Sequence, residues 1–145
     1  MDTYINAKTG SFEAIVEKME TVLGFITTEL ESANCSIDLT TNIAIATEEI
    51  FVNICHYAYT PNVGNVTIRV IIGEEIIIEF EDSGKPYNPL EKEAPDIETE
   101  IDVEDMEIGG MGILMVKNIM DAVYYRYEDN KNILTLRKKL DSEGN

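Results

Sequence analysis

The sequence predicts a two-layer α/β sandwich of the α+β kind, with helices covering one face of a mixed and mainly antiparallel sheet. Long stretches of the chain show apolar residues at helical spacing, and two pairs of β-rich runs are separated by short turns typical of hairpins. We find no internal repeat and no second-domain boundary, and 145 residues with 44% hydrophobic content suffice for one substantial core. We therefore expect a single domain over residues 1–145.

The N-terminal part predicts a short edge strand followed by a core-packing helix. Residues 3–7 alternate weakly between apolar and polar, which favours a strand. Apolar side chains then recur at helical spacing in a stripe made of Phe12, Ile15, Val16, Met19, Val22, Leu23, Ile26 and Leu30. Ser11 directly precedes this stripe and is a suitable N-cap for the helix.

Residues 42–59 predict a second helix of about five turns, because they contain no Gly or Pro and end just before Pro61. Ser36 or Asp38 is expected to cap it. One side of this helix would face the core with Ile43, Ala46, Ile50, Ile54 and Ala58.

Glu49 and Asn53 lie on an adjoining face of the same helix, one nearly above the other, because they are four residues apart. A Glu carboxylate is able to take a proton or orient a water, and the Asn amide oxygen is a hard ligand that suits Mg²⁺. The pattern also allows a half-exposed pair without a function.

Residues 65–72 and 75–81 predict a hairpin around Gly73-Glu74. Its second strand leads into Asp82-Ser83-Gly84-Lys85-Pro86-Tyr87-Asn88-Pro89, where the glycine leaves the backbone bare and the prolines stiffen the exit. A carboxylate held there, at Asp82, is suited to accept a hydrogen bond from an exocyclic amine such as that of adenine. An ordinary acidic turn is the alternative interpretation.

An acidic segment and a glycine cluster follow. Residues 90–107 contain Lys92 as their only base, and their composition is typical of a lid or of a linker that keeps the protein in solution. Gly109-Gly110-Met111-Gly112 then opens a third helix, whose unpaired N–H groups would attract phosphate oxygens, although such clusters also serve as hinges. Residues 122–127 and 133–140 predict a second hairpin.

The charge balance limits the choice of partners. With 28 acidic and 11 basic side chains, the formal net charge is −17, which would repel nucleic acid and anionic membrane surfaces and favour a basic protein partner. No stretch is long and apolar enough for a membrane span, and the N-terminus does not have the pattern of a signal peptide. The spacing of Cys35 and Cys55 fits neither a metal nor a redox motif, so we expect reduced thiols in a cytoplasmic protein.

Taken together and in this order, the motifs resemble those of the GHKL ATPase superfamily, which includes DNA gyrase, a heat-shock chaperone family, MutL and the histidine-kinase catalytic domains. The motifs are Glu49-Ile50-Phe51-Val52-Asn53, the exit that begins at Asp82, and Gly109-Gly110-Met111-Gly112. In the residues of these motifs and in its small size, the chain most resembles anti-sigma factor serine/threonine kinases of the SpoIIAB and RsbW type. The resemblance covers nearly the whole chain and implies a Bergerat-type ATP-binding fold, with the nucleotide between helix and sheet.

The resemblance also implies a role for each matching position. Glu49 would be the general base or water-orienting carboxylate, and Asn53 would ligate Mg²⁺. Asp82 would take the adenine amine, and Gly84 would let the base lie close. Residues 90–108 would form the ATP lid, and the backbone amides of Gly110, Met111 and Gly112 would bind the phosphates. Bound Mg²⁺ and a helix N-terminus would explain how so acidic a protein holds ATP.

This sequence departs from the family pattern near the phosphates. The family commonly has His four residues after the helix Asn, where this chain has Tyr57, with His56 one position early; we assign His56 no catalytic role. Tyr87 stands where Phe is usual. Kinase members often carry an Arg just before the glycines, where this chain has Glu107 and Ile108, and Lys117 is the first base after Lys92. This departure concerns phosphoryl transfer more than ATP binding.

Two functions follow from the resemblance. The first is an anti-sigma factor that uses Mg²⁺-ATP to phosphorylate a serine on a small antagonist protein. The added charge at the interface would change which protein the anti-sigma factor binds. The second is a non-catalytic switch, in which ATP orders the lid and sets which protein is held. Resembled members often dimerise, so a homodimer is expected. We favour the kinase, because Glu49 stands where a base would be needed.

Overall fold

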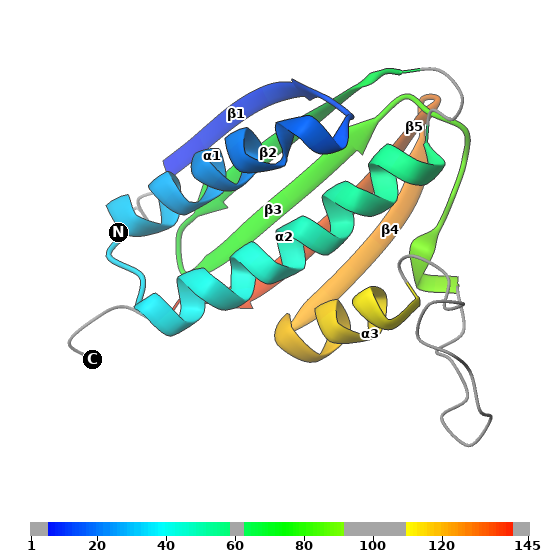
Figure 1. The fold of residues 1–145 in the computed structure, drawn as a ribbon. Helices are drawn as coiled ribbons and strands as arrows, with labels where there is room; N and C mark the ends of the chain where they lie inside the picture. Colours follow the sequence, from blue (N-terminus) through cyan, green and yellow to red (C-terminus); the bar gives the residue numbers. More distant parts are fainter. Residues whose placement is uncertain (1–5, 59–62, 92–109, 141–145) are drawn as a thin grey trace.

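The computed structural model describes residues 6–58, 63–91 and 110–140 (Figure 1). The segments of regular structure are, in chain order, β1 (Asn6–Glu13), the 3₁₀ turn η1 (Val16–Lys18), α1 (Met19–Ser32), α2 (Ile37–Tyr57), β2 (Asn65–Ile72), β3 (Glu75–Asp82), the 3₁₀ turn η2 (Pro89–Glu91), α3 (Gly110–Ile119), β4 (Ala122–Glu128) and β5 (Lys131–Lys139). Among these described helices, none combines the length and the hydropathy needed to cross a lipid bilayer.

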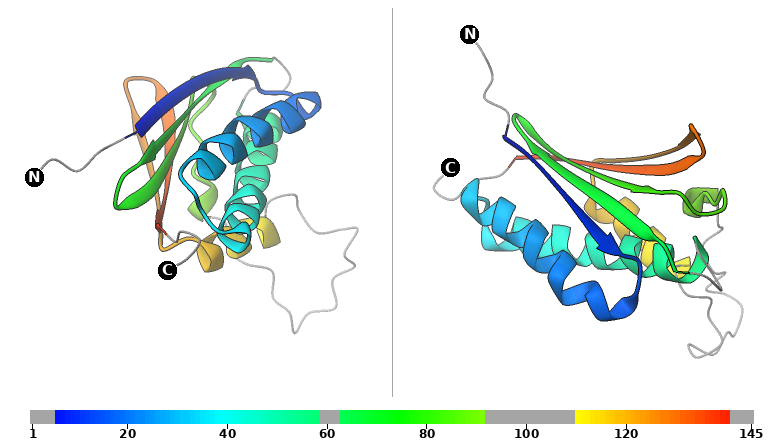
Figure 2. Two further views of the ribbon diagram at one scale, coloured as in Figure 1. Left: turned by 90° about the vertical axis from the view of Figure 1, so that its left-hand side faces the viewer. Right: turned by 90° about the horizontal axis from the view of Figure 1, so that it is seen from above.

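The five strands form one sheet in the order β1-β2-β3-β5-β4. All four pairings between the described strands are antiparallel. The predicted sheet is therefore present, and its described part is antiparallel throughout rather than mixed. The helices cover one face of this sheet, as the view from above in Figure 2 shows. The predicted two-layer α+β architecture is therefore confirmed.

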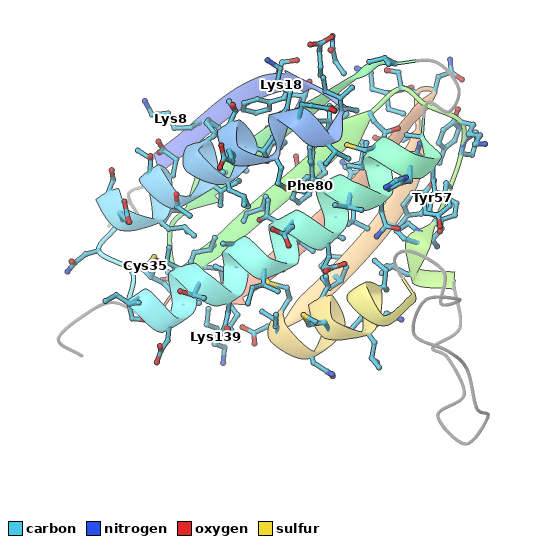
Figure 3. The ribbon with its side chains drawn as sticks, in the orientation of Figure 1. Lys8, Lys18, Cys35, Tyr57, Phe80 and Lys139 are labelled. Atoms are coloured by element: carbon cyan, nitrogen blue, oxygen red, sulfur yellow. The ribbon has the colours of Figure 1, made fainter. Side chains whose placement is uncertain are left out.

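The core fills the space between the two layers. Strands β2 and β3 alternate regularly between buried and less buried side chains, because one face of each strand is turned toward the helices. The core side predicted for α2 is also confirmed, since the five apolar residues assigned to that side, in α2 and at its C-cap, are all buried. Phe80 of β3, labelled in Figure 3, is among the largest fully buried side chains.

The caps and turns follow local chemistry. Ser36 is the N-cap of α2, and its Oγ accepts a hydrogen bond from the backbone N–H of Leu39 at 3.1 Å, as one of the two predicted caps requires. Asp129 and Asn130, between β4 and β5, both have positive φ angles, of 54° and 63°. Two such residues are typical of a type I′ hairpin turn. The turn places the start of β5 at Lys131, two residues before the predicted start.

The predicted N-terminal boundary is wrong. Residues 6–13 form a strand, and α1 begins at Met19 rather than after a cap at Ser11. Each residue of β1 pairs with a residue of β2, and this ladder outweighs the local helical pattern. Phe12, which the prediction counted in the helical stripe, is a strand residue whose ring packs against Phe25 of α1, with centroids 5.5 Å apart.

Candidate functional site

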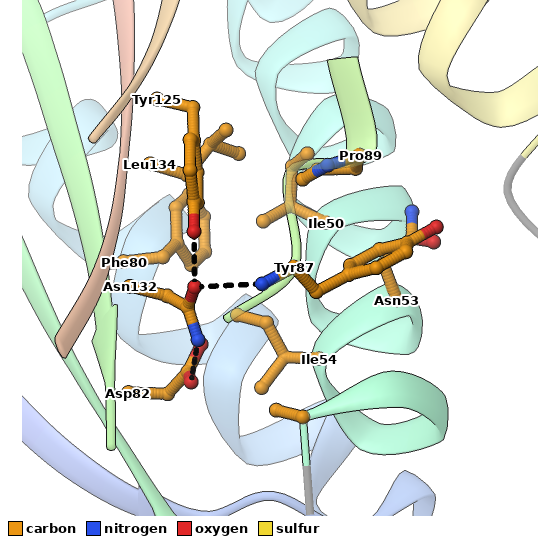
Figure 4. A pocket seen from close by; sticks show the side chains of 11 residues that line it. Ile50, Asn53, Ile54, Phe80, Asp82, Tyr87, Pro89, Tyr125, Asn132 and Leu134 are labelled. Carbon is orange, nitrogen blue, oxygen red and sulfur yellow. Dashed lines mark hydrogen bonds between the residues drawn. The ribbon is translucent and has the colours of Figure 1, made fainter. Parts of the chain in front are cut away.

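A pocket lies between α2 and the sheet, at the end where β3 runs into the predicted exit segment (Figure 4). The hollow is open to solvent, and about 370 Å³ of empty space lies within it when the open part is included. Its lining comes from α2 and its C-cap (Ile50, Asn53, Ile54, Ala58), from the sheet (Phe80, Asp82, Tyr125, Asn132, Leu134) and from the exit segment (Tyr87, Pro89). Two polar residues predicted from separate motifs, Asn53 and Asp82, thus meet in one pocket.

Asn53 is buried in this pocket with part of its amide unused. The residue is 3% exposed, and its Nδ2 donates a hydrogen bond to the backbone carbonyl of Glu49 at 3.0 Å. Its Oδ1 is buried and has no hydrogen-bond partner among the described residues. A buried amide oxygen without a donor costs roughly 1–3 kcal/mol, so its retention in a pocket indicates an external partner.

A divalent cation is one such partner. Among the described residues, no three His, Cys, Asp or Glu side chains gather into a metal cluster. Mg²⁺ does not require such a cluster, because it is commonly held by one or two protein oxygens together with phosphate oxygens and water. The free oxygen of Asn53 fits this kind of ligand set.

Glu49 lies one turn before Asn53 on α2, next to the start of α3. A Cβ placed on Gly112 would come within 1.9 Å of Glu49 Oε2, so only a glycine leaves room for the carboxylate in this position. Burial raises the pKa of the Glu49 carboxyl above its ordinary value, and the neighbouring Glu48 carboxylate raises it further. A half-buried carboxylate with a raised pKa is a stronger base than an exposed one.

Asp82 ends β3 inside the pocket and is 5% exposed. Its Oδ1 accepts hydrogen bonds from the backbone N–H of Gly84 and from Asn132 Nδ2, both at 2.9 Å. Burial raises the pKa of the carboxyl, and these two hydrogen bonds act in the opposite direction. Its Oδ2 accepts no hydrogen bond from the described residues, so it remains available to a donor on a ligand.

Gly84 has a structural reason to be glycine that the sequence did not indicate. A Cβ at this position would lie 2.3 Å from the carbonyl oxygen of Ala58, the C-cap of α2. The neighbouring Lys85 donates its backbone N–H to the same oxygen at 3.0 Å. The exit segment therefore packs directly on the end of α2 and closes this side of the pocket.

We expect Gly84→Ala to lower the free energy of unfolding by about 1–3 kcal/mol, because the methyl group would meet backbone atoms that cannot rotate away. Gly24→Ala is the matched control. Gly24 lies inside α1 with nothing within 4 Å of its Cβ position, so alanine there should stabilise by about 0.4–1 kcal/mol. Urea denaturation of both variants tests this, and equal stability of Gly84→Ala and the unchanged chain would contradict the close packing.

The glycine motif lies only partly within the described residues. Gly110 is the first residue of α3, and Gly112 is buried against Glu49. Met111 is the second residue of α3, whereas Gly109 and residues 92–108 of the predicted lid lie outside the described residues. The predicted phosphate contacts of Gly110, Met111 and Gly112 stay predictions.

Asn132 and Tyr125 line the pocket, and sequence reasoning did not identify either of them. Asn132 is the residue of β5 that stands directly opposite Asp82 of β3. A signal was present: Asn132 is a polar residue at the start of an apolar strand, where alternation would place it on the inner face. The contact of Asn132 with Asp82 could be inferred only once the pairing of β3 with β5 was known.

Comparison with known proteins places the chain in a family. Residues 12–138, most of the 145-residue chain, match the profile of the histidine kinase-like ATPase domain. The chain belongs to the histidine kinase-like ATPase domain family. The superfamily resemblance drawn from the three motifs is thereby confirmed.

Two curated relatives of this histidine kinase-like ATPase domain are named as protein kinases. It is 28% identical over 97 residues to the serine/threonine-protein kinase BtrW of Bordetella bronchiseptica, an alignment that covers 65% of this chain and 66% of BtrW. It is 23% identical over 111 residues to the serine-protein kinase RsbW of Bacillus cereus, covering 72% and 69%. The chain thus spans about two thirds of the length of these relatives, and their names agree with the type of kinase predicted from the motifs.

A solved structure shares the fold. The RsbU and RsbW domains of Rv1364c from Mycobacterium tuberculosis align with a TM-score of 0.66, covering 93% of this chain and 32% of that one. Because the sequence identity is 13%, this match establishes the fold alone.

The family motif is altered at two aromatic positions of the histidine kinase-like ATPase domain. Tyr57, at the place where the motif commonly has His, stacks on Tyr87 of the exit segment with ring centroids 4.8 Å apart and planes 20° apart. The two tyrosines therefore connect the end of α2 to the pocket wall. His56 is exposed.

The described part of the pocket lacks a basic side chain. None of its lining residues is Arg or Lys. Lys117 of α3 is exposed, and its Nζ donates to the backbone carbonyl of Leu90 at 3.4 Å. The residues that line the described part of the pocket therefore supply no positive charge for a bound anion, which the N-terminus of α3 or a metal ion would provide.

Proposed function

We propose that this protein binds ATP with Mg²⁺ and acts as a serine/threonine protein kinase of the anti-sigma type, which phosphorylates a small antagonist protein. The proposal rests above all on Asn53, which lines the pocket and whose buried amide oxygen has no partner among the described residues. Membership of the histidine kinase-like ATPase domain family supports ATP as the ligand. The kinase names of two relatives support phosphoryl transfer.

Each residue of the site has a task in this proposal. Asp82 accepts a hydrogen bond from the adenine amine through Oδ2, which the described residues leave without a donor. Gly84 keeps the exit segment against α2 and allows the base to lie close. The backbone amides of Gly110, Met111 and Gly112 bind phosphate oxygens at the start of α3.

Asn53 holds the metal through Oδ1. Bound Mg²⁺ would neutralise charge on the phosphates and orient them for in-line transfer. The hydrogen bond from Asn53 Nδ2 to the Glu49 carbonyl fixes the amide so that its oxygen, rather than its nitrogen, faces the ligand.

Glu49 is the general base. Its carboxylate takes the proton of the substrate serine hydroxyl as that oxygen attacks the γ-phosphorus, while the bond between this phosphorus and the oxygen bridging to the β-phosphate breaks and ADP leaves. Burial against Gly112 holds the side chain in place and raises its pKa, which favours proton uptake at neutral pH. The proton then remains on a Glu49 oxygen until it is lost to solvent.

The partners are a sigma factor and an antagonist of the anti-anti-sigma type. A net charge of −17 favours basic surfaces on these partners and opposes nucleic acid or an anionic membrane. We further propose a cytoplasmic location and a homodimer, both by resemblance to the kinase family.

A non-catalytic switch is the second candidate, and one observation favours it. No Arg or Lys lines the described part of the pocket, so developing charge on the γ-phosphate lacks a protein cation there. In this case ATP occupancy alone would determine which protein is bound.

The test has two steps. Titration calorimetry with ATP, in Mg²⁺ and then in EDTA, should show binding that depends on the metal. Incubation with γ-³²P-ATP and the anti-anti-sigma-type proteins of the organism that encodes this chain should then label a serine on one of them. ATP binding without any labelled protein would favour the switch, and no ATP binding by the folded chain would refute both functions.

ATP affinity is expected to fall by about tenfold as the pH is lowered through the raised pKa of Asp82. Above that pKa, the ionised carboxylate accepts a charge-assisted hydrogen bond from the adenine amine. Below it, the neutral carboxyl is a weaker acceptor. Purine riboside triphosphate is the control, because it carries the same phosphates and lacks the amine. Calorimetry should show a smaller pH dependence for this analogue, and identical profiles would contradict the role of Asp82.

A further inference from the structure

Asn132 lines the pocket and has no role in the function proposed above. It is the second residue of β5 and only 5% exposed. It stands directly opposite Asp82 in the register between β5 and β3, so the two side chains leave the same face of the sheet. A buried polar pair at the floor of a ligand pocket is costly unless its hydrogen bonds are satisfied.

Both ends of the Asn132 amide are used. Its Nδ2 donates to Asp82 Oδ1 and to the backbone carbonyl of Lys85, each at 2.9 Å. Its Oδ1 accepts from the backbone N–H of Tyr87 at 3.0 Å and from the hydroxyl of Tyr125. Figure 4 shows three of these four hydrogen bonds converging on the one side chain. The amide thus joins β3, the exit segment and β4.

The identity of the partners fixes the orientation of this amide. The Asp82 carboxylate and the Lys85 carbonyl are acceptors, so the NH₂ group must face them. The Tyr87 N–H is a donor, so the amide oxygen must face it. A flipped amide would place its oxygen against the Asp82 and Lys85 acceptors and its NH₂ group against the Tyr87 N–H donor.

This arrangement determines how Asp82 presents its carboxylate. Oδ1 is held by two N–H donors, one from Asn132 and one from Gly84, both at 2.9 Å. Two donors on one oxygen oppose rotation of the carboxylate group. The acceptor capacity of Oδ2 is therefore left in a fixed direction within the pocket.

We propose that Asn132 is a positioning residue for recognition of the purine 6-amino group, acting through Asp82 and the exit segment. The inference rests on the proposed function, since it requires ATP in this pocket. Asn132 does not itself contact the base in this proposal. It aligns the Asp82 carboxylate and fixes the backbone of residues 85–87, against which the base must fit.

The measurable consequence is a selectivity ratio. The unchanged chain should bind ATP about 10- to 100-fold more tightly than purine riboside triphosphate, which lacks the amine that Asp82 accepts from. If Asn132 only supports the fold, its loss would weaken both ligands equally and leave this ratio intact. If it positions Asp82, its loss would reduce the ratio.

The experiment measures the affinities of both nucleotides by calorimetry in Mg²⁺ for the full chain. Asn132→Ala should bring the ratio to within about threefold of unity. Leu136→Val is the control for general weakening of β5, because Leu136 is buried on the same strand and does not line the pocket. It should keep the ratio of the unchanged chain.

A milder pair of variants covers the case in which Asn132→Ala does not fold. Tyr125→Phe removes one hydroxyl donor from the Asn132 amide and should lower the ratio several-fold. Tyr124→Phe, at an exposed position on the same strand, should leave it unchanged.

The outcomes distinguish the positioning role of Asn132 from the proposed function of the protein. A ratio that stays the same in both Asn132→Ala and Tyr125→Phe overturns the positioning role while the proposed function stands. An unchanged chain that is folded and binds neither nucleotide overturns the proposed function, and the positioning role with it.

Discussion

Glu49→Gln is expected to lower the rate of phosphoryl transfer to the antagonist protein by about 10²- to 10⁴-fold, the usual contribution of a general base. ATP affinity should stay within about threefold of that of the unchanged chain. Gln has the shape of Glu, so the side chain keeps its place beside Gly112, and Glu49 is not among the residues that line the pocket. Single-turnover transfer from γ-³²P-ATP measures the rate, and titration calorimetry measures the affinity.

Glu48→Gln is the matched control for this prediction. Glu48 is the neighbouring carboxylate, exposed on α2, and its charge raises the pKa of Glu49. Its replacement should change the transfer rate by no more than a few-fold. Equal rates in the two variants would show that Glu49 is not the base. Absent transfer in the unchanged chain, with ATP bound, would instead support the non-catalytic switch.

The candidate site residues that the sequence indicated share a property: the pattern that marks each of them lies within a few positions of the chain. Glu49 and Asn53 stand one helical turn apart on a stretch free of Gly and Pro, so their common face follows from helix geometry alone. Asp82 stands where a β-rich run meets a glycine and two prolines, and the strand does end there. The buried side of α2 followed from the same periodicity.

The features that the sequence did not indicate depend on contacts between distant segments. The N-terminal strand was assigned in part to a helix, because its pairing with β2 involves residues more than 50 positions away. Asn132 meets Asp82 only through the pairing of β5 with β3, and nothing close to Asn132 in the sequence suggests that contact. The reasons for glycine at positions 84 and 112 are likewise close approaches to α2. Motifs located the pocket, and tertiary packing determined how its polar groups are held.

Asn53→Leu is expected to abolish Mg²⁺-dependent ATP binding, with a loss of affinity of at least about 100-fold, and to raise the free energy of unfolding in the absence of nucleotide by about 1–2 kcal/mol. Asn53 is 3% exposed, and its Oδ1 has no partner among the described residues. Leu has a similar size and no polar atom to leave unsatisfied. The Glu49 carbonyl that loses the Nδ2 donor is a helix carbonyl, which still receives the N–H four residues on.

Thr47→Val separates the two effects. Thr47 lies on α2, is fully buried, and its hydroxyl also lacks a partner among the described residues, yet it does not line the pocket. Its isosteric replacement should stabilise the chain by a comparable amount and leave ATP binding unchanged. Thermal unfolding without nucleotide, together with calorimetry in Mg²⁺, makes the comparison. A loss of stability in Asn53→Leu would mean that the amide serves the fold. A gain in stability combined with a loss of binding would mean that a destabilising oxygen is retained for its ligand, which is the behaviour expected of a binding site.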